Sequence, residues 1–282
     1  MKAEHSLSQL CAALGVKRSG YHAWVKAGAS QRERTDAALR QKIRTVHARH
    51  RGRYGAPRIQ QELATQGDRH GCKRIARLMR AEGIQGLCAR RFVPRTTPSN
   101  HAQPIAPNRL GQVPAPTRPN QTWGTDLTYV WPAEGWLYVA VLLDLWSRRV
   151  VGWATAETLH TRLVIQALQM AVRHRQPPRG VLHHSDRGVQ YASGEYRGWL
   201  AAAGLEPSMS RAGNPYDNAA MESFNATYKR ECVGLAEAIG GYATRAEAAD
   251  DFFNYVEKYY NRVRRHSSLG HQSPVDFELQ LN

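Results

Sequence analysis

Residues 122–156 have the sequence TWGTDLTYVWPAEGWLYVAVLLDLWSRRVVGWATA. Three segments rich in Val, Leu, Trp and Tyr follow one another here, at residues 122–131, 136–145 and 148–155. Glu134-Gly135 and Ser147 lie at the two breaks between them. Apolar segments of this length, separated by turn residues, predict three strands of an antiparallel meander. A carboxylate, Asp126, interrupts the first of these strands.

Helices and short strands alternate after the meander. Helical periodicity covers residues 160–175, a short strand covers 180–184, a helix spans roughly 193–203, a short strand lies near 205–209, and two helices lie at about 217–232 and 244–260. Three strands, helix, strand, helix, strand, helix is the element order of a ribonuclease-H-like fold. We therefore expect an α/β domain with a mixed five-stranded sheet and flanking helices.

Three acidic residues fall at distinctive places in this predicted fold. Asp126 lies on the first strand near the sheet centre, Asp186 (HHSDRGVQY) ends the fourth strand, and Glu222 (DNAAMESFNATYKRE) lies on a helix. Each alone also fits an ordinary role, as a strand-edge, turn or solvated helix residue. Together they would repel one another unless a cation lies between them, and carboxylates suit Mg²⁺ or Mn²⁺. Two such ions can activate a phosphodiester, so the pattern predicts a metal-dependent enzyme that acts on nucleic acid.

The positive charge is confined to the first part of the chain. Residues 1–120 hold 23 Lys and Arg against 6 Asp and Glu, a net charge of +17, and residues 121–282 hold 16 against 17. This asymmetry predicts a polyanionic partner, double-stranded DNA, bound in a salt-dependent way. An anionic membrane is the rival partner, but we find no long amphipathic segment, no run of 18 apolar residues and no secretory signal. We expect a cytoplasmic protein whose four cysteines are reduced thiols.

The basic region, 1–91, predicts a small all-α domain of the helix-turn-helix type. Two short helical patterns flank Gly15 within residues 7–27, and a second pair follows between Pro57 and Gly83. A helical bundle with a solvated basic face is the alternative. The candidate DNA contacts of this domain are Lys17, Arg18, Arg58, Lys73 and Arg74.

Residues 92–119 contain seven of the fourteen prolines and predict an extended linker. They divide the basic region from a second domain at 120–282.

The motifs of the second domain resemble those of a known family. They are WGTDLTYV, GWLYVAVLLDLWSRRVVGW, HHSDRGVQYAS, SMSRAGNPYDNAAMESF and YYNRVRRHSSLGHQSP, preceded by RYGAPRIQQEL and CKRIARLMRAEGI. The chain resembles the insertion-sequence DDE transposases of the IS-three type, which are related to retroviral integrases, and specifically their second-frame product. The resemblance covers nearly the whole chain. It departs from the family at Gly124 and at the NPY of 214–216, where other residues are frequent.

The resemblance implies a polynucleotidyl transferase of a mobile element in a prokaryotic, nucleoid-associated setting. Asp126, Asp186 and Glu222 would be the catalytic residues and hold Mg²⁺ or Mn²⁺ as two ions. Lys229, two helical turns after Glu222, would meet DNA. A homo-oligomer on DNA and the first-frame transposase product are the implied protein partners.

Further basic and polar residues are candidate DNA contacts. Arg211 and Asn218 would contact phosphates, unless Asp217 or Asn218 caps the helix instead. Near the C-terminus, Arg262, Arg264, Arg265 and His266 lie beside Tyr259 and Tyr260, a mixture suited to phosphate contact and base stacking or to a solvated helix end.

Other reactive side chains receive structural interpretations. Tyr129, Tyr191 and Ser185 are expected to be core or turn residues, because the implied chemistry needs no covalent intermediate. His183 and His184 fit either a substrate contact or a strand end. Asp144 is expected to form a turn or to pair with Arg148 or Arg149.

Three other functions remain as rivals. A DNA-binding regulator would keep the fold without activity, and a structure-selective nuclease would cut without strand transfer. A carboxylate glycosidase is more distant, because the basic half of the chain has no role in it.

Overall fold

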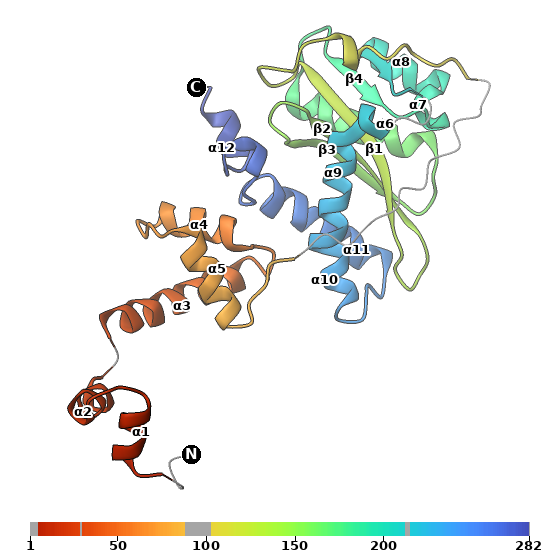
Figure 1. Ribbon diagram of the computed structural model, residues 1–282. Coiled ribbons are helices and arrows are strands. Elements are labelled where there is room, and N and C mark those ends of the chain that lie inside the picture. Colours follow the sequence, from red (N-terminus) through yellow and green to blue (C-terminus); the bar gives the residue numbers. More distant parts are fainter. Residues whose placement is uncertain (1–4, 29, 88–102, 212–214, 282) are drawn as a thin grey trace. The chain divides into compact units, whose positions relative to one another are not determined.

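The computed structural model describes residues 5–28, 30–87, 103–211 and 215–281. The chain divides into two compact units, Met1–Leu87 (unit 1) and Cys88–Asn282 (unit 2). Figure 1 shows their helices and strands along the chain. Within the described ranges, no helix is long and apolar enough to cross a membrane.

Unit 1 is entirely helical. Its helices are α1 (Leu7–Ala13), α2 (Arg18–Lys26), α3 (Gln31–Arg49), α4 (Ala56–Thr65) and α5 (Cys72–Ala81). The two predicted helix pairs correspond to α1–α2 and α4–α5. The long helix α3 was not predicted, because its few apolar residues are spread through a strongly charged sequence. It begins at a capping box formed by Ser30 and Glu33.

Helices α3, α4 and α5 share one small core. It consists of Leu39, Ile43, Val46, Ile59, Leu63, Ile75, Leu78 and Met79. At its edge Asp36 of α3 accepts hydrogen bonds from Arg77 (2.5 Å) and Arg74 (2.8 Å) of α5. These two guanidinium groups, Arg77 first, lower the pKa of Asp36 to about 2. Part of the positive charge of unit 1 is therefore used in ion pairs between α3 and α5.

Unit 2 is built on a five-stranded sheet. The strands are β1 (Thr122–Val130), β2 (Leu137–Asp144), β3 (Val150–Ala156), β4 (Leu182–Ser185) and β5 (Glu206–Met209). Their order is β3-β2-β1-β4-β5, with β1, β2 and β3 antiparallel and β4 and β5 parallel to β1. The predicted mixed five-stranded sheet with flanking helices is confirmed, and Asp126 lies on its central strand.

Helices cover both faces of this sheet. One group consists of α6 (Thr161–Arg175), α7 (Val189–Ala192) and α8 (Gly194–Ala202), and the other of α9 (Ala219–Tyr228), a π-helical turn at Lys229–Val233, α10 (Gly234–Glu237) and α11 (Arg245–Phe253) with a π-helical end at Asn254–Tyr260. Alternate residues of β2 face the two groups: Ala140 and Leu142 face α6, and Val139 and Val141 face α9 and α11. Burial on both faces explains why β2 is continuously apolar.

Close contact between α6 and β3 depends on a glycine. A Cβ atom at Gly152 would collide with the carbonyl oxygen of Ala167 and lie 2.8 Å from the backbone nitrogen of Ala171. The helix backbone thus packs directly on the strand backbone.

The second half of the predicted linker is attached to unit 2. Residues 92–102 lie outside the described residues. Beyond them, Ile105 packs against the core, and the backbone N–H and guanidinium of Arg109 donate to Ser208 (3.0 Å) and Glu206 (2.7 Å) on β5. A linker over the whole of 92–119 is therefore wrong. Residues 103–119 form only a short 3-10 helix, η1 (Leu110–Gln112), because their prolines lack the N–H group that longer helices and strands need. Their other N–H groups and their side chains remain able to bind β5.

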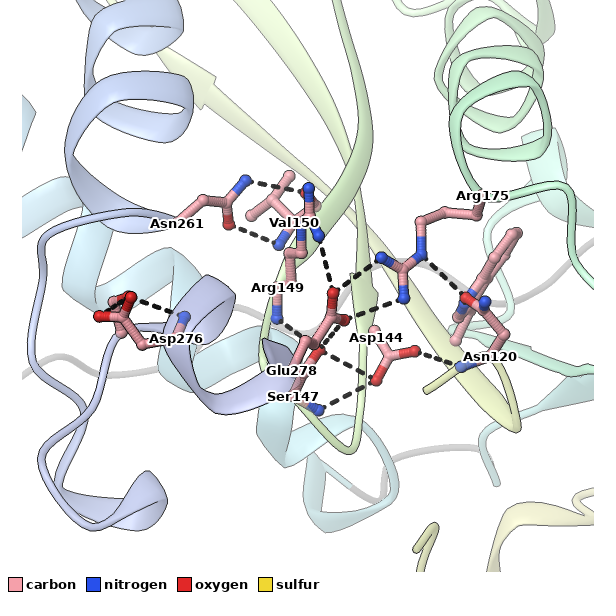
Figure 2. A network of polar contacts seen from close by, with 11 residues as sticks. Asn120, Asp144, Ser147, Arg149, Val150, Arg175, Asn261, Asp276 and Glu278 are labelled. Carbon is pink, nitrogen blue, oxygen red and sulfur yellow. Dashed lines mark hydrogen bonds and ion pairs between the residues drawn. The ribbon is translucent and has the colours of Figure 1, made fainter. Parts of the chain in front are cut away.

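A polar network joins the C-terminal helix α12 (Pro274–Leu279) to the sheet (Figure 2). Glu278 accepts hydrogen bonds from Arg175 (2.8 and 2.9 Å), Arg149 (2.7 Å) and Ser147 (2.8 Å). Burial alone would raise the pKa of Glu278, but the two arginines outweigh it and lower that pKa. The network closes the end of the sheet at which β1 begins.

Asp144 forms the turn beside this network. Its carboxylate accepts from the backbone N–H groups of Asn120 (2.7 Å), Trp146 (3.0 Å) and Ser147 (3.0 Å). The predicted turn role is confirmed, whereas Arg149 pairs with Glu278.

Candidate functional site

Strand pairing brings Asp126 and Asp186 together. The parallel strands β1 and β4 place Gly124 opposite His184. Asp126 follows Gly124 by two residues and is still on β1, and Asp186 follows His184 by two residues, just after β4. Because the two strands run parallel and in register, Asp126 and Asp186 lie next to each other, at the level where β4 ends.

Local hydrogen bonds hold each of these carboxylates. Asp186 Oδ1 accepts from the N–H of Gly188 (2.9 Å), in the turn that leads into α7. Asp126 Oδ1 accepts from the N–H of Leu127 (2.9 Å), and its Oδ2 accepts from Asn225 Nδ2 of α9 (2.8 Å). Both acids keep part of their surface accessible to solvent.

Glu222 reaches the same region from the first turn of α9, where it is exposed. The helix approaches β1 closely at Gly124, where an added Cβ would lie 3.3 Å from Met221 Cγ. The small size of the residue at position 124 therefore allows α9, and with it Glu222, to lie close to the strand.

Electrostatics couple the three acids. Burial above all, then the negative charge of Asp186 and, with a smaller effect, that of Glu222 raise the pKa of Asp126 to about 7. The N–H of Leu127 and the positive charge of Lys229 act in the opposite direction. A carboxyl whose neighbours resist its ionisation attracts cations.

Lys229 ends α9 and turns toward this cluster. Its Nζ lies 4.5 Å from the ring centroid of Tyr129, and burial lowers its pKa while the charge of Asp126 raises it. It stands at the start of a π-helical turn, a distortion common at functional sites.

The chemistry of these side chains fits a hard divalent cation. Asp126 and Asp186 supply carboxylate oxygens from neighbouring strands, and Glu222 is the third candidate ligand. Asn225 Nδ2 donates to Asp126, whereas the buried Oδ1 of the same amide accepts no hydrogen bond from the described residues. Among the described residues, however, no three His, Cys, Asp or Glu side chains lie close enough together to hold a metal ion. Glu222 would have to approach the two aspartates for all three to share one ion.

The remaining reactive side chains near Asp186 are buried and have structural roles. His183 bonds the hydroxyl of Tyr196 (3.0 Å), and His184 lies between Ser208 (2.9 Å) and Ser210 (3.0 Å). Burial lowers the pKa of His183 to about 3 and of His184 to about 4, so both are neutral at physiological pH.

Two of the three other hydroxyl candidates are internal. Tyr191 and Ser185 are buried, as expected of core and turn residues. Tyr129, by contrast, is 47% exposed, so its assignment to the core or a turn is wrong. Tyr129 lies near the end of β1, beyond the residues Thr122–Gly124 that pair with β4.

The predicted DNA contacts of unit 2 differ in accessibility. Arg264 is 4% exposed and donates to both oxygens of the buried Glu231 (2.8 and 2.8 Å), so a phosphate contact by Arg264 is excluded. Arg265 is half-buried and donates to the carbonyl oxygen of His271 (2.9 Å). Sequence proximity of arginines to aromatic residues failed here because it does not reveal a buried acid 33 residues away.

The neighbouring aromatic and polar residues are mostly internal as well. Tyr260 and His266 are buried with Arg264, which overturns the expected stacking surface there. Arg211 is exposed but paired with Asp217 (2.9 Å). Asn218 occupies the N-cap position of α9, but its Nδ2 donates to the carbonyl oxygen of Thr125 (3.4 Å) on β1.

In unit 1, Lys17, Arg18 and Lys73 are exposed. Arg58 lies 5.6 Å from the ring centroid of Tyr54, and Arg74 is bound to Asp36. The first three are therefore the more accessible cations of the predicted set.

One site residue escaped sequence reasoning. Asn225 follows Glu222 by three positions, so the two side chains share a helix face, and that spacing is the signal that could have revealed it. An isolated Asn in a helix carries little information until the strand facing it is known.

The fold and this carboxylate cluster define a protein with an integrase core. The integrase core domain family matches residues 116–215, a second integrase core domain family matches 203–274, and the HTH-like domain family matches 33–92. The HTH-like match contains α4 and α5 and excludes α1 and α2, the first of the two predicted helix pairs.

Sequence relatives define the family more closely. The chain is 45% identical over 268 residues to the insertion element IS600 uncharacterized 31 kDa protein of Shigella sonnei, covering 95% of this chain and 97% of the relative. It is 40% identical over 285 residues to transposase InsF for insertion sequence IS3A of Escherichia coli (strain K12), covering 98% and 95%. The chain belongs to the IS3-type family of insertion-sequence transposases.

A solved structure supports the fold. The chain is similar, with a TM-score of 0.50 and 15% identity, to a chain in the cryo-EM structure of the simian T-cell lymphotropic virus intasome in complex with PP2A regulatory subunit B56 gamma. The match covers 84% of this chain and 74% of that chain.

Proposed function

We propose that this chain is a DNA transposase that cuts DNA at the ends of its insertion sequence and joins the released 3′ ends to target DNA. The observation that supports this proposal is the parallel pairing of β1 with β4, which brings Asp126 and Asp186 side by side because Gly124 and His184, two residues before each acid, are register partners. Glu222 of α9 lies in the same region and adds a smaller effect to the raised pKa of Asp126. The membership of this chain in a transposase family supports a role for these acids in cutting and joining DNA.

The residues divide the work of two in-line displacements. Water first attacks a phosphodiester at the element end and breaks its P–O3′ bond, and the freed 3′-hydroxyl then attacks a target phosphodiester and displaces another 3′-oxygen. Asp126, Asp186 and Glu222 would hold Mg²⁺ or Mn²⁺, as two ions, which when bound supply activation of the attacking oxygen and neutralisation of the leaving oxygen. Asn225 fixes the orientation of Asp126, and Lys229 contacts the DNA phosphate.

Binding to the DNA would depend chiefly on the basic region, 1–91. Lys17, Arg18 and Lys73 present exposed cations there, while residues 121–282 carry a net charge of −1. Joining two element ends to a target requires more than one copy of the chain, so a homo-oligomer on DNA is part of the proposal, as is cooperation with a first-frame product.

Nicking and joining of labelled element-end DNA would test the proposal. The parent chain, with and without a first-frame partner, is incubated with Mg²⁺ or Mn²⁺ beside Glu222→Gln. Glu237→Gln is the matched control, because it makes the same chemical change at an exposed position on α10. We expect nicking and joining by the parent and the control, and neither by Glu222→Gln.

Each rival has its own outcome. DNA binding without cutting by any protein would favour a regulator. Cutting without joining would favour a nuclease. Equal cutting by Glu222→Gln and the parent would remove Glu222 from the site.

A further inference from the structure

Exposed aromatic side chains gather at the free end of the β1–β2 hairpin. Tyr129 is 47% exposed, Trp131 61% and Trp136 40%, and we call these three residues the aromatic tip. The ring of Trp136 lies edge-to-face with both others, at centroid distances of 4.9 Å to Tyr129 and 4.1 Å to Trp131. They form one continuous group of rings at the solvent boundary.

The pairing of the strands explains why the rings meet. Tyr129 pairs with Tyr138 and Val130 with Leu137, so the residues that follow in the hairpin place Trp131 and Trp136 opposite each other. Alternation along each strand puts the aromatic tip on one face and the buried Val130 and Leu137 on the other.

The backbone of the hairpin end is held independently of these rings. The N–H of Ala133 donates to the carbonyl oxygen of Tyr242 (3.0 Å), and Arg245 Nε donates to the carbonyl oxygen of Trp136 (3.0 Å). The N–H of Arg245 donates to Glu134 (2.9 Å). Large aromatic rings therefore stand exposed on a hairpin end whose backbone is held by hydrogen bonds that do not involve the rings.

The aromatic tip adjoins the catalytic carboxylates through one side chain. Lys229 Nζ lies 4.5 Å from the ring centroid of Tyr129 and interacts electrostatically with Asp126. A strand of nucleic acid whose phosphate meets Lys229 can thus bring its bases over the rings. The nearby acid Glu134 is occupied by the backbone of Arg245.

We propose that the aromatic tip is a stacking platform for unpaired bases at a DNA end whose phosphate lies at Lys229. This inference rests on the proposed function, which brings DNA to Asp126. Aromatic rings beside a cation bind single-stranded nucleic acid with little sequence preference, because every base presents a π-face. The nearness of a cation and of the reacting centre favours DNA over a protein partner.

Binding of tailed and blunt duplexes provides the test. A duplex of arbitrary sequence carrying a short single-stranded tail with 2-aminopurine, and the same duplex without the tail, are titrated with the full chain in EDTA. We expect the parent to prefer the tailed duplex and to quench the 2-aminopurine. The double variant Trp131→Leu/Trp136→Leu should lose roughly fivefold or more of its affinity for the tailed duplex and keep its affinity for the blunt one.

A matched control is Trp199→Leu, which removes a 43% exposed indole from α8 and should leave the preference unchanged. An unchanged preference in the double variant would overturn the proposal. If the double variant keeps its preference for the tailed duplex but no longer self-associates in sedimentation, the aromatic tip contacts a second copy of the chain, and the stacking proposal is overturned.

The two proposals fail separately. Stacking is measured without divalent metal, and the transposase function is measured by nicking with Glu222→Gln. If nicking depends on Glu222 but the tip variants bind tailed DNA normally, only the stacking proposal fails. If tailed DNA is preferred but no DNA is ever cut, the transposase function fails.

Discussion

At the scale of single residues, Asp126 links function to stability. Its pKa is about 7 in the folded chain against an ordinary value of 3.8. The folded state therefore retains a proton that the unfolded chain releases, and the metal-free protein loses stability as the pH rises from about 4 to about 7. We expect Asp126→Asn to remove this loss of stability with pH, since an amide cannot ionise. Its single oxygen can accept from Asn225, at the cost of the hydrogen bond from Leu127 at every pH.

Denaturant midpoints in EDTA at pH 5 and pH 8 would measure this effect. The fall in midpoint between the two pH values should be smaller in Asp126→Asn than in the parent. Glu195→Gln, at an exposed position on α8, provides a control that should follow the parent. Identical pH profiles for the parent and Asp126→Asn would contradict the raised pKa.

Gly124 carries a second residue-level prediction. A methyl group there would lie 3.0 Å from Leu145 Cδ2 and 3.3 Å from Met221 Cγ, so flexible side chains can yield to it, but the branches of valine would press on α9. We expect Gly124→Ala to nick DNA at nearly the parent rate. Gly124→Val should be slower by roughly ten- to a hundredfold, because α9 would carry Glu222 away from Asp126.

Initial rates of nicking at saturating DNA would decide this, with circular dichroism to establish that each variant is folded. A folded Gly124→Val with the parent rate would show that the approach of α9 to β1 does not position Glu222. The glycine at position 124, where other residues are frequent in the family, would then have no consequence for the site.

The chain sequence revealed the acids more readily than their partners. Asp126 and Asp186 were recognisable because a carboxylate in or directly after an apolar strand is unusual. Asn225 was not, because its role depends on how α9 is rotated against β1. Arg264 appeared to be a DNA contact until the buried Glu231 accounted for it.

At the scale of elements, the strands were predictable and several helical features were not. Burial of β2 on both faces leaves a continuous apolar segment that sequence analysis detects directly. Helix α3 buries only a narrow stripe and escaped detection, while the π-helical turn at Lys229–Val233 has no sequence signature distinct from an α-helix. Attachment of Ile105 to the core and of Arg109 and Leu110 to β5 depends on contacts distant in sequence, which local patterns do not contain.

The attachment of α12 makes an element-level prediction. Glu278 is the common acceptor for Arg149, just before β3, and Arg175, the last residue of α6 (Figure 2). Its neutral analogue would leave two half-buried guanidinium groups without a counter-charge. We expect Glu278→Gln to destabilise the chain by about 1–3 kcal/mol, measured by urea unfolding. Glu237→Gln should change stability little, and equal midpoints for the two variants would show that the network contributes nothing.

At the scale of the whole molecule, charge separates binding from chemistry. The first 120 residues carry a net charge of +17, and the remainder carries −1. Affinity for DNA should therefore depend on the salt concentration through the exposed cations of unit 1, since each phosphate contact releases condensed counterions. Asp126, Asp186 and Glu222 lie in the part of the chain without this excess, where further positive charge would compete with metal for the acids.

Replacing cations in each unit tests this division. Lys17→Ala, Arg18→Ala and Lys73→Ala combined should flatten the plot of log affinity against log salt by up to about 2.7, or about 0.9 for each lost contact. A matched triple of exposed arginines in unit 2, Arg162→Ala, Arg173→Ala and Arg197→Ala, removes the same charge and should leave the slope close to that of the parent. Fluorescence anisotropy on one duplex across a salt series gives all three slopes. Equal flattening by both triple variants would mean that the affinity for DNA depends on the total charge of the chain. The prediction that the basic region provides the phosphate contacts would then be wrong.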